Sequence, residues 1–343
     1  MSDVVLRWGI LSAGLISGDF VTALKSTKDA TKHKVIAIGA KRPGTAEKFA
    51  NQFDIPKHFE SYEEVYKRND IDIIYIGTTI NMHRELTLAS LENGKHVLCE
   101  KALAVNAKEV QEIIQKAREK KLFLMEGLWS RFFPIYDRLG ALLKQEDRIG
   151  APKFVFARLC GYASKDSLAR SYDKSSCCGV VLDRLVYGIQ FANFVFGKEM
   201  PYDIAASAVL DENGVDYSVS VILRYSGDRM AQLFATMELD VDSNAEIWGT
   251  KGTIKLPPMF HSPQRMQIDN TGEIYIPFPK KSPPCAFYFS TSEGLCYEAD
   301  GVRDCILNGQ TESDRMTLDE SLLIARVLDR IRKIIKLEYP QDN

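Results

Sequence analysis

The chain lacks the features that mark a membrane or secreted protein. No run among its 343 residues approaches the roughly 18 consecutive apolar residues that a membrane span requires. The N-terminus leads directly into a strand-like pattern and lacks the basic-then-apolar order of a signal peptide. We therefore expect a cytoplasmic protein without a membrane partner.

Disulfides, metal clusters and an excess of one charge are also missing. The 7 cysteines are an odd number with no repeated spacing, which excludes an obvious disulfide framework. Cys177 and Cys178 are adjacent, but no histidine or cysteine cluster accompanies them, so we expect no metal site. The formal net charge is −2, and the basic residues are scattered, so no nucleic-acid partner is expected.

Strand and helix patterns alternate through the first third of the chain. Buried-strand runs are expected at 4–11, 34–40, 71–77, 96–100 and 122–126. Helical spacing is expected between them at 16–24, 46–53, 82–93 and 106–120. Parallel strands joined by helices of this length form right-handed crossovers. The pattern predicts a doubly wound α/β domain over residues 1–127, of the Rossmann type.

The pattern changes in residues 128–343, where strands follow one another with few helices between them. Helices are expected at 134–144, 180–196, 297–308 and 318–335, and a proline-rich loop at 280–284. Strands are expected at 153–161, 204–210, 217–225, 230–238, 244–248, 253–255 and 274–276. Runs of neighbouring strands favour an open, mainly antiparallel sheet with helices on one face. This second part is predicted to be an α+β domain.

The turn after the first strand has the character of a dinucleotide-binding loop. A glycine-rich fingerprint needs a tight turn, a close approach for pyrophosphate and a small residue where the helix meets the strand. Gly9, Ser12, Gly14 and Ser17 supply small residues in register with it. The following helix would offer free N–H groups to a phosphate. Alone the match is weak, because glycine-containing strand–helix turns are common.

The end of the second strand favours NADP over NAD. Enzymes that use NAD usually place an acidic residue there to bind the ribose 2′-hydroxyl. Here Lys41 and Arg42 occupy that place, and an arginine can bind a 2′-phosphate through two parallel hydrogen bonds. The alternative is that both are ordinary surface charges.

Several stretches, spread in order over almost the whole chain, together resemble one enzyme family. They are LRWGI at 6–10, GLIS at 14–17, GKHVLCEK at 94–101, LFLME at 122–126, WSRFFP at 129–134, Leu182-Asp183, Tyr187, Gln190-Phe191, GTKG at 249–252 and YPQD at 339–342. The chain resembles the Gfo/Idh/MocA oxidoreductases and, within them, the dimeric dihydrodiol dehydrogenases, also described as NADP-dependent D-xylose dehydrogenases.

The resemblance implies hydride transfer between NADP and an alcohol carbon of a trans-dihydrodiol or a pentose-type sugar. It also implies a homodimer that pairs through the outer face of the second sheet. It makes Lys101 the active-site lysine beside the nicotinamide, with Asp183 and Tyr187 as catalytic and substrate-contacting positions and Trp129 on the wall of the substrate pocket. The cofactor-binding residues that follow from the turn and the resemblance together are Gly9, Ser12, Gly14, Leu15, Ile16, Lys41, Arg42, Tyr75, Thr78, His83, Glu100 and Lys101.

Elementary chemistry agrees with these roles. Lys101 follows a predicted parallel strand, at the edge where open α/β sheets bind ligands. Asp183 and Tyr187 are four residues apart on a predicted helix and share one face. A phenol is a poor base unless a nearby ammonium group lowers its pKa, and Lys101 would supply that charge. Without the resemblance, the lysine would be interpreted as a surface residue and the tyrosine as a core residue.

Five residues around the site depart from the family pattern. Ala102 stands where the family has proline, and Cys178 where it has glycine. Arg184 and Leu185 add a charge and bulk where dihydrodiol dehydrogenases have an apolar residue and a glycine. A Phe-Asp pair near their substrate pocket is matched by Phe287-Tyr288.

These departures predict a changed substrate preference. They also leave three other interpretations open. The first is an NADP(H)-binding sensor without turnover. The second is a sugar or polyol oxidoreductase rather than a dihydrodiol one. The third is a purely structural interaction protein that binds no NADP(H).

Overall fold

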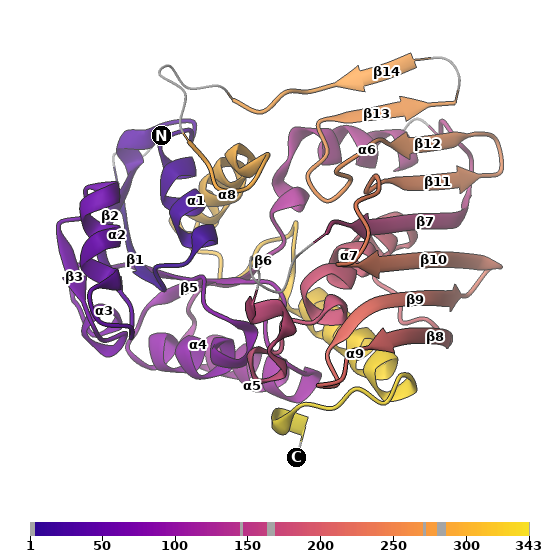
Figure 1. Ribbon diagram of the computed structural model, residues 1–343. Helices are drawn as coiled ribbons and strands as arrows, with labels where there is room; N and C mark the ends of the chain where they lie inside the picture. Colours follow the sequence, from indigo (N-terminus) through magenta and orange to yellow (C-terminus); the bar gives the residue numbers. More distant parts are fainter. Residues whose placement is uncertain (1–3, 145–146, 163–168, 270–271, 280–285, 343) are drawn as a thin grey trace.

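Two β-sheets, each with helices packed on it, make up the molecule (Figure 1). The structure is a computed structural model that describes residues 4–144, 147–162, 169–269, 272–279 and 286–342. The first sheet lies in the N-terminal part and has six strands, and the second has eight. The α/β architecture predicted from the sequence is confirmed.

The first sheet is parallel throughout, with strand order β3-β2-β1-β4-β5-β6. The order reverses at β1, so the carboxyl ends of β1 and β4 flank the place where open α/β sheets bind ligands. The strands are β1 Leu6–Leu11, β2 His33–Gly39, β3 Lys57–Phe59, β4 Ile73–Ile76, β5 His96–Glu100 and β6 Leu124–Gly127, and the helices are α1 Leu15–Leu24, α2 Thr45–Phe53, α3 Glu63–Tyr66, α4 His83–Glu92 and α5 Ala107–Lys120. Strand β3 and helix α3 were not predicted, because three and four residues are too few to show a period.

The second sheet has the order β14-β13-β12-β11-β7-β10-β9-β8 and is antiparallel except where β7 pairs with β10. The strands are β7 Pro152–Cys160, β8 Asp203–Leu210, β9 Asp216–Tyr225, β10 Arg229–Thr236, β11 Ala245–Gly249, β12 Thr253–Leu256, β13 Arg265–Ile268 and β14 Gly272–Tyr275. The mainly antiparallel sheet is thus confirmed. Strand β13 was missed, since its alternation covers only four residues, and the predicted loop at 280–284 lies outside the described residues.

Four helices complete the fold: α6 Pro134–Lys144, α7 Val186–Phe196, α8 Leu295–Leu307 and α9 Leu318–Ile334. Helix α7 lies against β7 and β10 on one face of the second sheet, and α9 packs on α5, α7 and β8. Helix α8 returns to the N-terminal part and packs on α1 (Figure 1). A division of the chain at residues 127 and 128 stays a prediction.

A buried aspartate fastens the C-terminal segment to α1. Asp19 is fully buried, and its carboxylate accepts the backbone N–H groups of Tyr288 and Phe289 at 2.7 and 2.9 Å. It also accepts the Ser292 hydroxyl at 2.6 Å. Hydrogen bonds to a charged acceptor are stronger than those between neutral groups. The segment that leads into α8 is therefore held on the N-terminal part of the molecule.

One helical stretch among the described residues, Lys174–Phe196, is long and apolar enough by length and composition alone to cross a membrane. Of the window that passes this test, 78% is buried inside the protein. It contains α7, which packs between the second sheet and α9. The core helix of a globular protein can be equally long and apolar, and the packing of α7 identifies this stretch as such a core helix.

Candidate active site

The loop between β1 and α1 is shaped to receive a phosphate. Ser12 has a φ of 100°, a left-handed conformation that turns the chain sharply, and its hydroxyl accepts the Gly14 N–H at 3.2 Å. Within the described residues no side chain caps α1, whose first residues are Leu15 and Ile16. The uncapped N–H groups and the positive end of the helix dipole therefore face the loop, as an anion requires.

Gly9 lies in the strand before the predicted cofactor loop, and its predicted cofactor contact stays a prediction. It lies inside β1, three residues before the turn at Ser12. A Cβ at Gly9 would stand 2.8 Å from the side chains of Ile74 and Val65. This glycine therefore allows α3 to pack closely on the sheet and has no place in the loop.

Lys41 and Arg42 stand just beyond the carboxyl end of β2, and both are exposed. The Ser12 N–H donates to the Gly39 carbonyl at 2.9 Å, which holds the β2 end against the phosphate loop. The Lys41 ammonium lies 5.6 Å from the centre of the Tyr62 ring. Within the described residues no carboxylate forms an ion pair with Arg42, so its guanidinium is available to an anion.

Lys101 immediately follows β5, and a histidine bridges its loop to the loop after β4. His83 is buried, and its Nδ1 lies 2.8 Å from the Ala102 carbonyl oxygen. Its Nε2 lies 3.2 Å from the Thr78 carbonyl oxygen. Burial lowers the pKa of His83 to about 4, and a neutral ring, which has one N–H, donates to only one of these two carbonyls. In the structure His83 acts as a brace between two loops, and its predicted cofactor contact stays a prediction.

The structure brings Lys101, Asp183 and Tyr187 together from two parts of the chain. The Lys101 ammonium donates to the Asp183 backbone carbonyl and to Oδ1 of its carboxylate, both at 2.6 Å. It also lies 5.2 Å from the centre of the Tyr187 ring. Asp183 retains 27% of its side-chain exposure, so the cluster opens to solvent on one side. These are the three residues that the sequence predicted as catalytic.

The electrostatics of the cluster affect Asp183 and Tyr187 differently. Burial raises the pKa of Asp183, but the charges of Lys101 and Arg170 outweigh it and lower that pKa to about 2. Burial and the negative charges of Glu100 and Asp183 raise the pKa of Tyr187 well above its usual value. The pKa of Tyr187 is thus raised overall in this structure, and a lowering of it by Lys101 stays a prediction. At neutral pH Tyr187 keeps its proton and is a hydrogen-bond donor.

A second aspartate positions the segment that carries Asp183. The buried Asp216 accepts the Val181 N–H at 2.6 Å, close to the start of the wide helical turn Val181–Leu185 that precedes α7. Burial raises the pKa of Asp216 to about 6. A Cβ at Gly179 would lie 1.9 Å from the Asp216 carboxylate, so only glycine allows this approach.

The departures near Asp183 lie mostly away from the reacting cluster. The Arg184 guanidinium turns to the second sheet, where it donates to the backbone carbonyls of Gly161 and Thr236. Leu185 and Cys178 are buried in the core. The charge of Arg184 still reaches the cluster, where it helps to lower the pKa of Asp183.

Two buried acids, Glu100 and Glu298, lie behind the cluster, and the sequence analysis did not predict Glu298. Tyr75 is fully buried, stacks on Phe20 with ring centres 3.9 Å apart, and donates to Glu100 at 2.7 Å. It therefore supports Glu100 from within the sheet. Glu298 of α8 is also fully buried, and neither of its carboxyl oxygens has a partner among the described residues. Burial and the charge of Glu100 raise the pKa of Glu298 well above its usual value.

The wall around Tyr187 contains one predicted and one missed residue. Trp129 begins the short helix Trp129–Phe132 and is 8% exposed, and its indole Nε1 is buried without a hydrogen-bond partner among the described residues. The His261 ring packs edge-on against Tyr187 with centres 5.5 Å apart. Burial lowers the pKa of His261 to about 4. No spacing marks a lone histidine in the sequence, and only the fold reveals this contact.

The residues present fit a dinucleotide cofactor. Buried polar atoms that lack a partner among the described residues gather around the loops after β1 and β4, and they are Ser17 Oγ, Thr78 Oγ1 and Asn81 Oδ1. A buried polar group without a partner costs about 1–3 kcal/mol, so such groups together indicate a polar ligand. They lie beside the uncapped start of α1, at the switch point of a parallel sheet.

Fold and site thus define an oxidoreductase with a nicotinamide dinucleotide domain, and comparison with known proteins gives its family. Residues 6–128 match the model of the oxidoreductase family with an NAD-binding Rossmann fold, and residues 140–255 match the GFO/IDH/MocA C-terminal domain. The chain belongs to the Gfo/Idh/MocA oxidoreductase family, as its motifs predicted.

Named relatives match over nearly the full length. The chain is 43% identical to trans-1,2-dihydrobenzene-1,2-diol dehydrogenase of Xenopus tropicalis, over 97% of this chain and 99% of that one. It is 36% identical to the human protein of the same name, over 99% of each. A 3-ketoreductase of Actinomadura kijaniata crystallised with NADP superposes with a TM-score of 0.82 at 22% identity, over 96% of this chain and 98% of that one. A levoglucosan dehydrogenase crystallised with NADH and levoglucosan superposes with a TM-score of 0.83 at 19% identity, over 96% of this chain and 97% of that one.

Proposed function

We propose that the protein transfers a hydride between NADP and an alcohol carbon of a trans-dihydrodiol or a pentose-type sugar. The observation that carries the proposal is the cluster of Lys101, Asp183 and Tyr187 at the carboxyl end of β5. Relatives named for a dihydrodiol support the first substrate class. The solved levoglucosan complex supports a sugar.

Each residue of the cluster has a distinct role in the proposal. A nicotinamide dinucleotide held by the loops after β1 and β4 would supply the hydride acceptor or donor. Tyr187 keeps its proton at neutral pH, so in reduction it donates that proton to the substrate oxygen and regains one from solvent. In oxidation it must first lose its proton to solvent before it can accept the proton of the alcohol. Lys101 stabilises negative charge on the same oxygen, and Asp183 holds the ammonium in place through a 2.6 Å bond.

Turnover on a defined panel tests this function. Purified protein with NADP should oxidise trans-dihydrodiols or pentoses, followed through the absorbance of NADPH. Quenching of tryptophan fluorescence by NADPH, with no turnover on any substrate of the panel, would instead identify the NADP(H)-binding sensor. Absence of NADP(H) binding would leave only a structural role.

We propose NADP rather than NAD because two exposed cations and no acid follow β2. Replacing Lys41 and Arg42 together by alanine should weaken NADP binding by about 10–100-fold, since a 2′-phosphate loses charge-assisted hydrogen bonds of roughly 1.5–3 kcal/mol. NAD binding should change less than about twofold. Isothermal titration with both cofactors measures the difference, and equal losses for the two would remove the 2′-phosphate assignment.

We also propose a homodimer that pairs through the second sheet. The face of the sheet turned away from α7 carries half-exposed apolar side chains on adjacent strands, namely Phe154, Phe156, Ile222, Met230, Phe234 and Trp248. Phe154 and Trp248 are cross-strand partners with ring centres 4.9 Å apart, and Trp248 is 46% exposed. A contiguous apolar face of this kind marks an interaction surface.

Replacing Phe154 and Trp248 by glutamate should convert the dimer into monomers, because four like charges would meet when two copies pair. Light scattering after size exclusion measures the mass. Val4→Glu, at an exposed residue before β1, is the matched control and should leave the dimer intact. A monomeric wild-type protein, or an unchanged mass in the double variant, would rule out this surface.

A further inference from the structure

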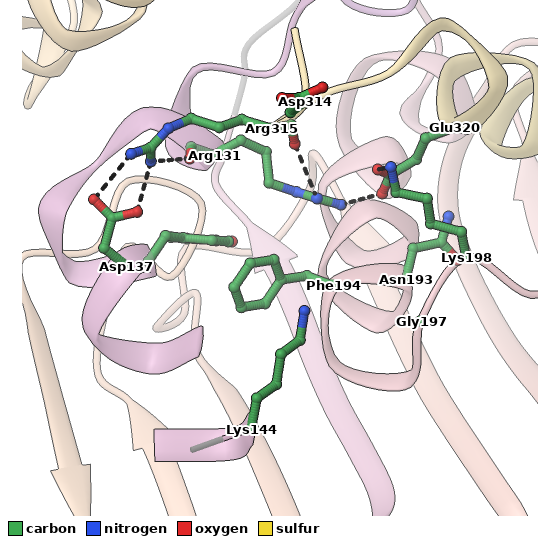
Figure 2. Close-up of a pocket in the computed structure, with 11 residues that line it drawn as sticks. Arg131, Asp137, Lys144, Asn193, Phe194, Gly197, Lys198, Asp314, Arg315 and Glu320 are labelled. Atoms are coloured by element: carbon green, nitrogen blue, oxygen red, sulfur yellow. Dashed lines mark hydrogen bonds and ion pairs between the residues drawn. The ribbon is translucent and has the colours of Figure 1, made fainter. Parts of the chain in front are cut away.

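A cavity lies at the opposite end of α7 from Asp183 and Tyr187. It has a volume of about 210 Å³ and opens between the end of α6, the carboxyl end of α7 and the segment that leads into α9. Figure 2 shows Asn193, Lys144 and Lys198 around it, with Phe194 at its base. None of these residues belongs to the cofactor loops or to the Lys101 cluster.

The walls of this cavity are fixed by internal contacts. Arg131 is buried, donates to the Gln190 side chain at 2.5 Å and pairs with the fully buried Glu320 (Figure 2). Its guanidinium lies 5.2 Å from the centre of the Phe194 ring. Arg315 closes the rim through hydrogen bonds of 2.6 and 3.2 Å to Asp137. Each of these two ion pairs is neutral, and together they hold the walls of the cavity in place.

Asn193 is the group that these internal contacts leave unsatisfied. It is 1% exposed, it lines the cavity, and neither its Oδ1 nor its Nδ2 has a hydrogen-bond partner among the described residues. Leaving a buried donor or acceptor unpaired costs about 1–3 kcal/mol. The amide therefore offers one donor and one acceptor to an occupant of the cavity.

Two lysines add positive charge at the same place. Lys144 extends toward the cavity, and no carboxylate in the described part of the chain pairs with it (Figure 2). The Lys198 ammonium donates to Thr317 at 3.0 Å and lies 3.5 Å from Glu320. Apart from the two neutral pairs, only Asp314 among the lining residues opposes these charges. The lining side chains thus carry a net positive charge, which favours an anion in the cavity.

We propose that this cavity binds a small hydroxylated oxyanion, a carboxylate or a phosphate ester. The two ammonium groups bind the oxyanion, and the Asn193 amide binds a hydroxyl, which both donates and accepts. The carbon skeleton packs on Phe194 and Tyr136, whose rings are 4.9 Å apart. The volume is below the roughly 300–1,000 Å³ of drug-sized pockets, which excludes a nucleotide.

Glycerate and glycerol 3-phosphate are the probes, titrated calorimetrically into the full-length protein saturated with NADP. Either probe should bind at least about tenfold more tightly than acetate, which lacks hydroxyls, and than glycerol, which lacks charge, a difference of roughly 1.4 kcal/mol. Binding of one probe alone identifies a carboxylate or a phosphate ester. If neither probe binds, the proposal is overturned. It is also overturned if a probe binds the protein without NADP but does not bind the protein saturated with NADP.

Two variants place the probe in this cavity. Lys144→Gln removes an exposed charge and should weaken the probe by about tenfold without affecting the fold. Asn193→Leu should abolish probe binding. Lys108→Gln, an exposed lysine on α5, is the matched control and should bind as the wild type does. Equal affinity in the Lys144 variant and its control would overturn the proposal. Because binding is measured without turnover, the result is independent of the proposed function.

Discussion

Lys101→Met is expected to reduce hydride transfer by at least about 10²-fold while NADPH affinity stays within about tenfold, or roughly 1.4 kcal/mol. The ammonium of Lys101 lies against both Asp183 and the Tyr187 ring. Its removal leaves the substrate oxygen without that charge and leaves Asp183 without its 2.6 Å partner. Single-turnover kinetics, with NADPH titrated separately by fluorescence, distinguish loss of chemistry from loss of binding.

A matched control and a pH profile sharpen this experiment. Lys108→Met, on the surface of α5, should keep wild-type turnover. In the wild type, turnover in the reducing direction should stay flat from about pH 7 to 8, because the pKa of Asp183 is about 2, that of Asp216 is about 6 and that of Tyr187 is well above its usual value. Unchanged turnover in Lys101→Met would remove this lysine from the mechanism.

Arg131→Met is expected to destabilise the protein by about 3–5 kcal/mol, because it leaves the carboxylate of Glu320 buried without its main partner. Glu320 has 0% of its side chain exposed, and its remaining cation, Lys198, is 3.5 Å away. Methionine is unbranched and replaces the aliphatic part of the arginine, so the cost arises mainly from the unpaired charge of Glu320 and the lost hydrogen bonds to Gln190. Urea unfolding followed by circular dichroism measures the change.

The double variant Arg131→Met with Glu320→Gln is the control for that result. It removes both charges, and replacing a whole buried pair is often neutral or even stabilising. We therefore expect it to regain most of the lost stability. A double variant as unstable as Arg131→Met alone would show that packing around the guanidinium, and not the charge, determines the effect.

The sequence predicted most of the fold because the strand and helix periods are local. It also named Lys101, Asp183 and Tyr187 through the resemblance to an enzyme family, and the structure brings these three residues together. Lys41 and Arg42 were predicted to bind a 2′-phosphate from their place after a strand, and the structure places them there. Short elements such as β3 and α3 carry too few residues for a period and were missed.

The remaining features of the site depend on contacts between residues far apart in the chain. Gly9 was assigned to the loop, but its neighbours Val65 and Ile74 are brought to it only by the folded sheet. The pKa of Tyr187 depends on its burial and on the charge of Glu100 from another strand. Glu298 meets that same glutamate only because α8 returns to the N-terminal part. Contacts of this kind have no local signal in a sequence.

The packing of α8 on α1 also has a consequence for how the protein is made. The last strand of the first sheet ends at Gly127, whereas α8 begins at Leu295. At a synthesis rate of about 5–20 residues per second, roughly 10–30 s separate the two on the ribosome. During that interval Asp19 and the apolar side of α1 have no covering segment. The nucleotide-binding domain thus emerges from the ribosome before α8 can cover α1. A chain that terminates before residue 295 keeps this surface exposed to chaperones and proteases.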